Sequence, residues 1–302
     1  MRILITGSTG FVGSNLVDYL SESMGEEIRP LDLRQPLDAK VMDDAHTIIH
    51  LAGKAHDLKQ SSLSDEYDTV NFGLTKKLYD AFLKSDASLF IFMSSVKAAA
   101  DLVDGDLLES AIPDPLTAYG KSKLKAEEYI GSQALPAGKT YCILRPCMIH
   151  GPGNKGNLNL LYKLVKMGIP YPLAAFDNRR SFLSVRNLCF VIKEIITRRD
   201  IPSGIYNVAD DQPLATTAVV NLLSQAINKK GTGILNINPA VIKMLAGIGD
   251  VLHLPLNSER LQKLTENYTV SNQKIKNWLN KELPLHSSEG IILTGRSFFK
   301  DK

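Results

Sequence analysis

Tyr119 and Lys123 are four residues apart in the stretch LTAYGKSK, at residues 116–123. On a helix, positions i and i+4 lie on one face, so these two side chains would be neighbours. A tyrosine hydroxyl with a pKa near ~10 is a weak base at neutral pH, and a neighbouring ammonium favours its phenolate form. The pair could therefore transfer a proton, although the stretch taken alone also fits a solvated tyrosine–lysine pair.

Two serines end the apolar run SLFIFMSS (88–95), which predicts a strand just before the helix of the Tyr119 stretch. A serine hydroxyl at that strand end could hold a substrate oxygen close to the tyrosine. The order strand, loop, helix makes this geometry feasible. Ser94 and Ser95 are both candidates on this argument.

A glycine-rich turn follows the first predicted strand, RILIT, in the stretch TGSTGFVG at residues 6–13. Gly7, Gly10 and Gly13 would allow a tight turn, a close approach of the backbone to a pyrophosphate, and packing of the next helix against the strand. The N-terminus of that helix offers free N–H groups and a partial positive charge to phosphates. The context predicts a dinucleotide site, and the alternative is a glycine turn that binds nothing.

Asp32 lies near the end of the second predicted strand, 27–33, about 20 residues beyond the glycine turn. A carboxylate there can accept hydrogen bonds from the adenosine ribose and repels a 2′-phosphate, which favours NAD. Arg34 could instead pair with that phosphate, so NADP remains an alternative. An ordinary strand-end aspartate is the other interpretation.

Short β-branched runs alternate with longer amphipathic segments through the first half of the chain, which is typical of βαβ units. We predict an α/β fold: a Rossmann-type doubly wound parallel sheet with a smaller mixed α/β C-terminal substrate-binding region. The dinucleotide-binding domain is assigned to 1–153 with returning segments near 181–210, and the substrate-binding domain mainly to 154–302. The predicted strands are 2–6, 27–33, 46–53, 88–95 and 140–146, and the predicted helices are 11–23, 64–84 and 118–134.

Composition excludes several classes of function. The 302 residues carry a formal net charge of +3, which is too near neutral to indicate nucleic acid or a membrane surface as a partner. The three cysteines, Cys142, Cys147 and Cys189, form no CxxC pair, so we expect no metal site and a reducing, cytoplasmic location. The apolar segment 239–256 is interrupted by Lys243 and Asp250, and a buried or cleft-lining helix is expected there rather than membrane insertion.

Taken together, these motifs resemble the extended short-chain dehydrogenase/reductase family, in its NAD-dependent epimerase/dehydratase type. TGSTGFVG is similar to the family's TGxxGxxG, AYGKSK to its YxxxK, and LRPCMIHGPG to its LRPxxVYGPG segment. The resemblance implies that Ser95, Tyr119 and Lys123 are catalytic, and that Asn157 and Arg180 bind the diphosphate of a nucleotide sugar. The cofactor contacts that it implies are Gly7, Gly10, Phe11, Val12, Gly13, Asp32, Leu51, Ala52, Gly53, Lys123 and Pro146.

The reaction implied by the resemblance is hydride chemistry at C4 of a nucleotide-linked hexose. A UDP-hexose or UDP-N-acetylhexosamine 4-epimerase of polysaccharide biosynthesis is the first interpretation. An NAD(P)H-dependent reductase of a UDP-4-keto-6-deoxy sugar and a non-catalytic redox sensor remain alternatives. No acidic residue follows Ser95 in SSVKAAA, which argues against a 4,6-dehydratase. Relatives also imply a homodimer through helix 118–134, with Leu124, Tyr129 and Ile130 as contacts.

The sequence also leads to expectations for four further polar residues. His50 lies in an apolar run and is expected in the core, and Asn71 is expected to bridge the cofactor strand by hydrogen bonds. His150 stands where the family often has tyrosine, and Asn187 where it usually has aspartate. The short link after Asp32 implies that a strand, a helix and some adenine contacts of the family are missing or trimmed.

Overall fold

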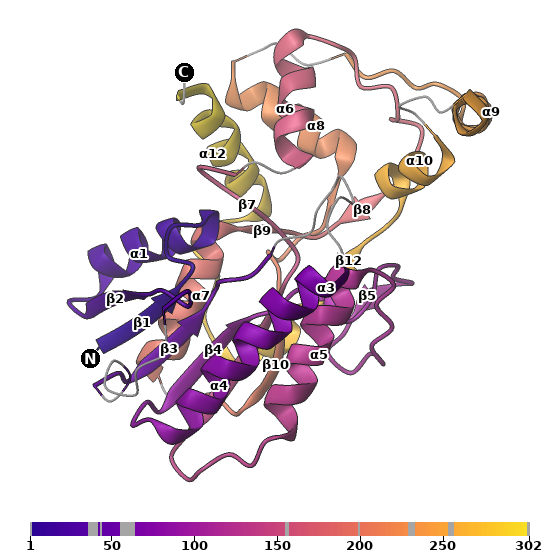
Figure 1. Cartoon of the computed structure of the whole chain (residues 1–302). Coiled ribbons are helices and arrows are strands. Elements are labelled where there is room, and N and C mark those ends of the chain that lie inside the picture. The colour runs from indigo at the N-terminus through magenta and orange to yellow at the C-terminus, as the bar shows by residue number, and fades with distance from the viewer. Residues whose placement is uncertain are drawn as a thin grey trace.

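The computed structural model describes residues 2–35, 42, 44–54, 64–154, 157–198, 200–228, 233–252 and 257–300. Its centre is a six-stranded sheet in which every neighbouring pair is parallel, in the order β10-β6-β4-β3-β1-β2 (Figure 1). The α/β, Rossmann-type fold predicted from the sequence is confirmed. The six strands are β1 Arg2–Thr6, β2 Glu27–Leu31, β3 Thr47–His50, β4 Leu89–Met93, β6 Thr140–Pro146 and β10 Gly204–Val208.

Helices cover both faces of this sheet. Because side chains alternate along a strand, Ile3 and Ile5 pack with α1 (Phe11–Ser23) and α7 (Val185–Arg198), whereas Leu4 packs with α4 (Leu74–Lys84) and α5 (Ala118–Ser132). A strand buried on both faces reads as a continuous apolar run, which is why RILIT could be recognised in the sequence. α11 (Gln273–Leu279) joins the α1 side near β10.

The strand order reverses between β1 and β3. β2 lies on one side of β1, and β3, β4 and β6 follow on the other. In open parallel sheets, ligands bind in the crevice beyond the carboxyl ends of the strands at such a point. The glycine turn after β1 and the segment Leu51–Gly53 after β3 are therefore at the expected ligand position.

The long helix predicted around 64–84 is confirmed, but it is not uniform. It consists of α3 (Ser64–Tyr67), a π-helical turn η1 (Asp68–Gly73) and α4. The π-helical turn carries the buried Asn71. Such turns cost regular hydrogen bonding and are frequent at functional sites.

A second region rises beyond the sheet, and it has an apolar core of its own. Its helices are α6 (Asn157–Met167), α8 (Thr216–Ala226), α9 (Pro239–Leu252), α10 (Ser258–Thr265) and α12 (Ser287–Lys300). Three two-stranded sheets connect it to the larger region: β11 (Leu214–Ala215) with β8 (Arg179–Arg180), β12 (Thr269–Val270) with β5 (Asp106–Leu107), and β7 (Met148–His150) with β9 (Phe182–Ser184). The domain boundary near residue 153 remains a proposal.

Two packing expectations need correction. The apolar helix α9 buries Ile242, Ala246 and Gly249 but leaves a second apolar face exposed, so the expectation of burial is wrong for that face. Ile130, expected as a dimer contact, is fully buried beneath α5 in the core of its own chain. In the described ranges, no helix is long and apolar enough to cross a membrane.

Candidate active site

The glycine turn is built around contacts that only glycine permits. Gly7 has a φ of 69°, and a Cβ there would lie 2.7 Å from the backbone nitrogen of Ala52. A Cβ on Gly13 would lie 2.1 Å from the carbonyl oxygen of Gly7, which locks the start of α1 against the turn. The exposed Gly10 is the N-cap of α1. The first N–H groups of this helix, at Phe11, Val12 and Gly13, have no intrahelical partners and are available for phosphates.

The glycine turn is joined to the segment after β3 by hydrogen bonds. The Leu51 amide donates to the Thr6 carbonyl at 3.3 Å, and the Ala52 amide donates to the Thr6 hydroxyl at 3.1 Å. At Gly53, a Cβ would lie 2.9 Å from Asn71 Oδ1 and 3.2 Å from Lys123 Nζ. The glycine turn and the segment after β3 thus form a backbone cradle with no room for a Cβ, and these residues would hold a dinucleotide.

Asp32 comes directly after β2 and is exposed. Its carboxylate accepts two hydrogen bonds from the Arg34 guanidinium Nε, at 2.9 and 3.1 Å, and one from Nη2 at 2.9 Å. These hydrogen bonds lower the pKa of Asp32. Ribose hydroxyls that bind the Asp32 carboxylate would lie beside the Arg34 guanidinium. Recognition of NAD and recognition of NADP therefore both depend on the arrangement of this ion pair.

The two serines after β4 point in different directions. Ser94 is buried, and its hydroxyl donates to the Glu127 carboxylate on α5. Ser95 caps the short 3-10 helix η2 (Val96–Ala98), accepting from the Lys97 amide at 3.2 Å, and its side chain is hydrogen-bonded to Tyr119. Geometry therefore selects Ser95, rather than Ser94, as the partner of the tyrosine.

Gly120 brings Tyr119 to Ser95. A Cβ at Gly120 would lie 2.3 Å from the Lys97 carbonyl oxygen, so only glycine lets α5 approach η2 this closely. Thr117 caps α5 by accepting from the Gly120 amide at 3.2 Å. The role of Gly120 was missed at the sequence level, although a glycine next to Tyr119 is the signal that could have found it.

Tyr119 contacts the edge of the Tyr67 ring, with centroids 6.0 Å apart. Burial raises the pKa of its hydroxyl, and the hydrogen bond with Ser95 acts in the opposite direction. The phenol is therefore the form that these surroundings favour. Formation of the phenolate needs additional positive charge close to the ring.

Lys123 lies one turn further along α5 and is buried. Its ammonium donates to the Met93 carbonyl at 2.8 Å and lies over the Phe92 ring, 4.9 Å from the centroid. Burial lowers the pKa of Lys123 to about 8, partly offset by the charge of Glu127. The lysine is thus charged at neutral pH and held at the carboxyl end of β4, next to Gly53.

A buried ion pair that sequence reasoning missed lies behind this lysine. The carboxylate of Glu127 accepts from the Arg145 Nε at 3.0 and 3.1 Å and from its Nη2 at 2.5 Å, and both side chains are 1% exposed. Arg145 comes from β6, two strands along from β3. A charged residue inside the apolar run CILRP was the signal, because a buried charge requires a partner. The pair fixes α5 to the sheet at the position of Lys123.

Arg180 lies on β8, where its guanidinium forms an ion pair with Glu266 at 3.1 Å. Burial lowers the pKa of Arg180, and Glu266 acts in the opposite direction. Tyr268 is paired with Arg180 through an isolated β-bridge. The Tyr268 hydroxyl donates to the Ala100 carbonyl at 2.7 Å. Lys97, two residues after Ser95, is within electrostatic reach of both Arg180 and Glu266. Arg180 is thus tied to the loop that carries Ser95.

The remaining predicted contacts are placed less directly. Pro146 ends β6 beside Val208 of β10. Asn157 begins α6, and its side chain lies outside the described part of the chain. Asn71 bridges the segment after β3 to α5 as predicted, accepting from the Lys54 amide at 2.8 Å and donating to Ser122 at 3.1 Å. The roles assigned to the site residues remain proposals.

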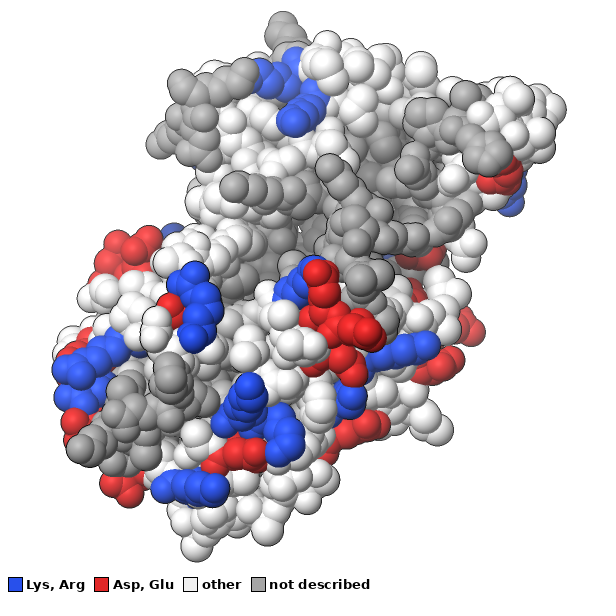
Figure 2. All heavy atoms as spheres, viewed as in Figure 1, with Lys and Arg blue, Asp and Glu red and all other residues white. Residues whose placement is uncertain are grey.

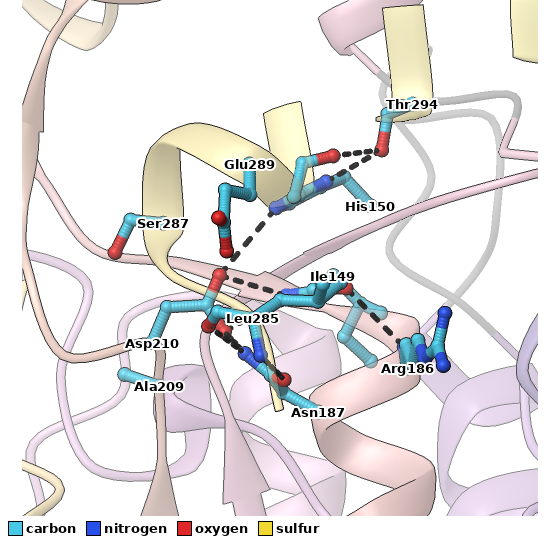
Figure 3. Close-up of polar contacts among 12 residues, drawn as sticks. Ile149, His150, Arg186, Asn187, Ala209, Asp210, Leu285, Ser287, Glu289 and Thr294 are labelled. Carbon is cyan, nitrogen blue, oxygen red and sulfur yellow. Dashed lines mark hydrogen bonds and ion pairs between the residues drawn. The ribbon is translucent and has the colours of Figure 1, made fainter. Parts of the chain in front are cut away.

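His50 and His150 are core residues. His50 is fully buried between the hydroxyls of Thr6, at 2.7 Å, and Thr75, at 2.9 Å. Burial lowers the pKa of His50 to about 3, so it is neutral and acts as packing, as predicted. His150 is also fully buried, with Nδ1 2.8 Å from the Thr294 hydroxyl of α12 (Figure 3).

Asn187 lies in the same buried cluster as His150, and its hydrogen bonds there account for asparagine at this position. Its side-chain amide donates to the Asp210 carboxylate at 2.7 Å and to the Leu285 carbonyl at 2.9 Å (Figure 3). The carboxylate of Asp210 also accepts from the Ser184 amide at 3.0 and 3.1 Å. An aspartate at 187 would face a second buried carboxylate, so asparagine is the residue that this neighbourhood accepts. The cluster ties α12 to α7 and is structural.

Comparison with known proteins agrees with this geometry. A family model described as the NAD dependent epimerase/dehydratase family matches residues 3–209. A UDP-glucose 4-epimerase of Vibrio cholerae is 28% identical over 325 aligned residues, covering 99% of this chain and 95% of the relative. An N-acetyl-alpha-D-glucosaminyl-diphospho-ditrans,octacis-undecaprenol 4-epimerase of Escherichia coli O157:H7 is 29% identical over 247 residues, covering 76% of this chain and 73% of the relative.

Solved structures match the fold over the whole chain. The UDP-N-acetylglucosamine 4-epimerase of Bacillus cereus has a TM-score of 0.76 at 20% identity, with 98% of each chain covered. The family model spans more than half of this chain, and the matched residues include the glycine turn and the Tyr119 helix. The chain therefore belongs to the NAD dependent epimerase/dehydratase family, as its motifs indicated.

Proposed function

We propose that this chain is an NAD-dependent 4-epimerase of a diphosphate-linked hexose, with a UDP-hexose or UDP-N-acetylhexosamine as the first substrate candidate. The observation that carries the proposal is the hydrogen-bonded Ser95–Tyr119 pair, one helical turn from a buried, charged Lys123. Ser95 follows β4, and Lys123 donates to Met93 at the carboxyl end of that strand and lies next to Gly53. The names of the Vibrio cholerae and Bacillus cereus proteins support the same reaction.

In this mechanism, Tyr119 removes the proton from the C4 hydroxyl and returns it after the sugar has turned over. NAD, when bound, supplies the hydride acceptor and donor at C4. Ser95 donates to the C4 oxygen and holds it close to the tyrosine. Lys123 supplies positive charge that favours the phenolate, opposing the effect of burial on Tyr119.

Arg180 would bind the diphosphate, remote from the reacting carbon. Its ion pair with Glu266 must rearrange or accommodate the phosphates, since both partners are largely buried. Remote binding energy positions the hexose without tight contacts at the ring, which would let the 4-keto sugar turn over. Asn157 is proposed for the same diphosphate from its sequence position. A cytoplasmic homodimer in polysaccharide biosynthesis is proposed as the setting.

A reductase of a UDP-4-keto-6-deoxy sugar would use the same three side chains, so an assay must separate the two. The epimerase retains its dinucleotide, because every hydride that leaves the sugar returns to it. Purified protein should therefore interconvert UDP-glucose and UDP-galactose, or their N-acetyl analogues, without added dinucleotide. Consumption of NADH or NADPH with a UDP-4-keto sugar and no interconversion would support the reductase. A chain that binds NAD but turns over neither substrate would be a sensor.

A lipid-linked sugar is the second substrate candidate. The Escherichia coli relative is named for a hexosamine carried on undecaprenyl diphosphate, which shares the diphosphate with a UDP-sugar. One feature of this chain favours that candidate: the exposed apolar face of α9. The test is to offer both substrates in parallel, since a strict UDP-sugar epimerase will not act on the lipid-linked hexosamine.

A further inference from the structure

Helix α9 has two apolar faces, and only one of them packs against the protein. Ile242, Ala246 and Gly249 are buried. Six other large apolar side chains follow the spacing i, i+3, i+4, i+7 and so share one face. Each is 43–75% exposed: Val241, Met244, Leu245, Ile248, Val251 and Leu252.

The charged residues of α9 lie away from this face. With about 100° between successive residues, Lys243 and Asp250 fall on the side of the helix opposite the exposed apolar residues. The carboxylate of Asp250 is also turned to α10, where it accepts from the Ser258 amide at 2.9 Å and the Ser258 hydroxyl at 2.5 Å. Figure 2 shows most of the charged groups on this side of the molecule over the sheet region, not over α9. The face is apolar without interruption.

A further exposed apolar side chain lies along the chain between α9 and the residues of the proposed diphosphate position. The exposed Leu264 lies at the end of α10, and its carbonyl accepts from Asn178, two residues before Arg180, at 3.2 Å. Two residues after Leu264, Glu266 forms the ion pair with Arg180. Figure 1 shows α9 and α10 projecting together beyond β8 and β12. Apolar side chains on α9 and α10 that lead along the chain to Arg180 would suit an amphiphile whose anionic headgroup takes the place of Glu266 beside Arg180.

Size separates the candidate occupants. Six half-exposed side chains on one helix offer several hundred Å², below the roughly 800 Å² per partner of a stable protein interface. The helix has 14 residues, about 21 Å at 1.5 Å per residue, and is too short to cross a hydrocarbon core of about 30 Å. The exposed apolar face of α9 could instead lie in the plane of a bilayer surface, with its side chains at the boundary of headgroups and acyl chains.

We propose that the exposed face of α9, with Leu264, docks on the surface of a lipid bilayer and places Arg180 at the diphosphate of a lipid-linked sugar. This rests on the proposed function for the chemistry at C4 and names the substrate class: a hexose on a lipid diphosphate. The docking is peripheral, with the apolar side chains at the boundary of headgroups and acyl chains and the sheet region in water.

Flotation of the full-length protein with vesicles of phosphatidylglycerol and phosphatidylethanolamine in equal parts tests the docking. The variant Met244→Gln/Leu245→Gln/Ile248→Gln removes the centre of the face, and because these side chains are 45–60% exposed we expect the fold to be retained. The control Leu160→Gln/Met167→Gln/Phe299→Gln changes three side chains that are 60–66% exposed on α6 and α12. Wild type and control should float with the vesicles, and the amount of the α9 variant in the floating fraction should be about tenfold lower.

Activity supplies the second measurement. The α9 variant should keep the wild-type rate on a UDP-sugar in solution and lose about tenfold on N-acetylglucosaminyl-diphospho-polyprenol in the same vesicles. Wild type that stays out of the floating fraction, or an α9 variant that floats equally well, would overturn the docking. Conversion of a dimer to a monomer by the α9 variant, without vesicle binding by wild type, would identify a protein interface instead. Flotation needs no turnover, so failure of the epimerase proposal leaves this result readable.

Discussion

Helices α5 and α9 are nearly equal in length and reverse the usual relation between polarity and burial. α5 has the sequence AYGKSKLKAEEYIGS and buries Lys123 and Glu127 against the sheet. α9 has the sequence PAVIKMLAGIGDVL and leaves six large apolar side chains exposed. Burying a charge and exposing a large apolar face both cost free energy in a protein that only has to fold. Both helices are therefore places where a functional explanation is needed.

The two helices differ in how tightly their surroundings fix them. α5 is held by the buried Glu127–Arg145 pair, by the close approach at Gly120 and by the lysine bond to Met93. α9 is joined to its own region through one apolar face and through Asp250. Substitutions should consequently cost much more on and around α5 than on α9, and four predictions test this difference.

The largest effect is expected at the buried ion pair. Glu127→Gln leaves the Arg145 guanidinium buried without a counter-charge, so we expect a loss of about 3–5 kcal/mol in the free energy of unfolding. Glu128→Gln changes the exposed neighbour and should alter stability by less than about 0.5 kcal/mol. Urea denaturation of both variants measures the difference. Equal midpoints would show that α5 is not held by this pair.

The next effect is expected at the glycine turn. Gly13→Ala places a Cβ 2.1 Å from the Gly7 carbonyl oxygen. We expect it to lower the free energy of unfolding by about 2–4 kcal/mol and to weaken the binding of NAD. Gly247→Ala on α9 meets no atom within 4 Å and should stabilise the chain by up to about 1 kcal/mol, because alanine favours helix. Thermal unfolding distinguishes the two, and a loss of stability at position 247 would contradict the exposure of α9.

A smaller effect should appear in the dependence of stability on pH. The folded pKa of Lys123 is about 8, below the ordinary value of about 10.4, so the unfolded chain binds an additional proton between these values. Below pH 8 the buried charge lowers the free energy of unfolding. Relative to Lys123→Met, this free energy should rise by about 2 kcal/mol between pH 8 and 10. Titrating tyrosines are common to both proteins. Parallel stability curves for the two would mean that Lys123 is not buried as a cation.

The smallest effect on stability is expected at the exposed face of α9. Leu245→Gln should change the free energy of unfolding by less than about 0.5 kcal/mol, since the side chain is about half exposed. Chemical denaturation checks this prediction alongside vesicle binding. A loss of more than about 2 kcal/mol would place Leu245 in a packed interior and remove the basis for docking.

Local patterns in the sequence were sufficient to predict the elements whose contacts are made within a few residues of the chain. The strand–glycine turn–helix unit and the Tyr119–Lys123 spacing are encoded within a few residues, and the structure contains both. The Glu127–Arg145 pair, the fit of Gly120 against Lys97 and the π-helical turn at Asn71 depend on segments far apart in the chain. Hydropathy alone predicted burial of α9, because it does not register which face the tertiary structure leaves uncovered.

Proton transfer by Tyr119 is the central claim, and one comparison tests it most directly. Interconversion of UDP-glucose and UDP-galactose is followed by NMR for the wild type and for Tyr119→Phe, without added dinucleotide. The account predicts turnover by the wild type and a decrease in kcat of about 10²–10⁴-fold in the variant, with the fold retained. Unchanged turnover in Tyr119→Phe would contradict it. A wild type that never interconverts the two sugars yet reduces a 4-keto sugar would instead overturn the epimerase assignment.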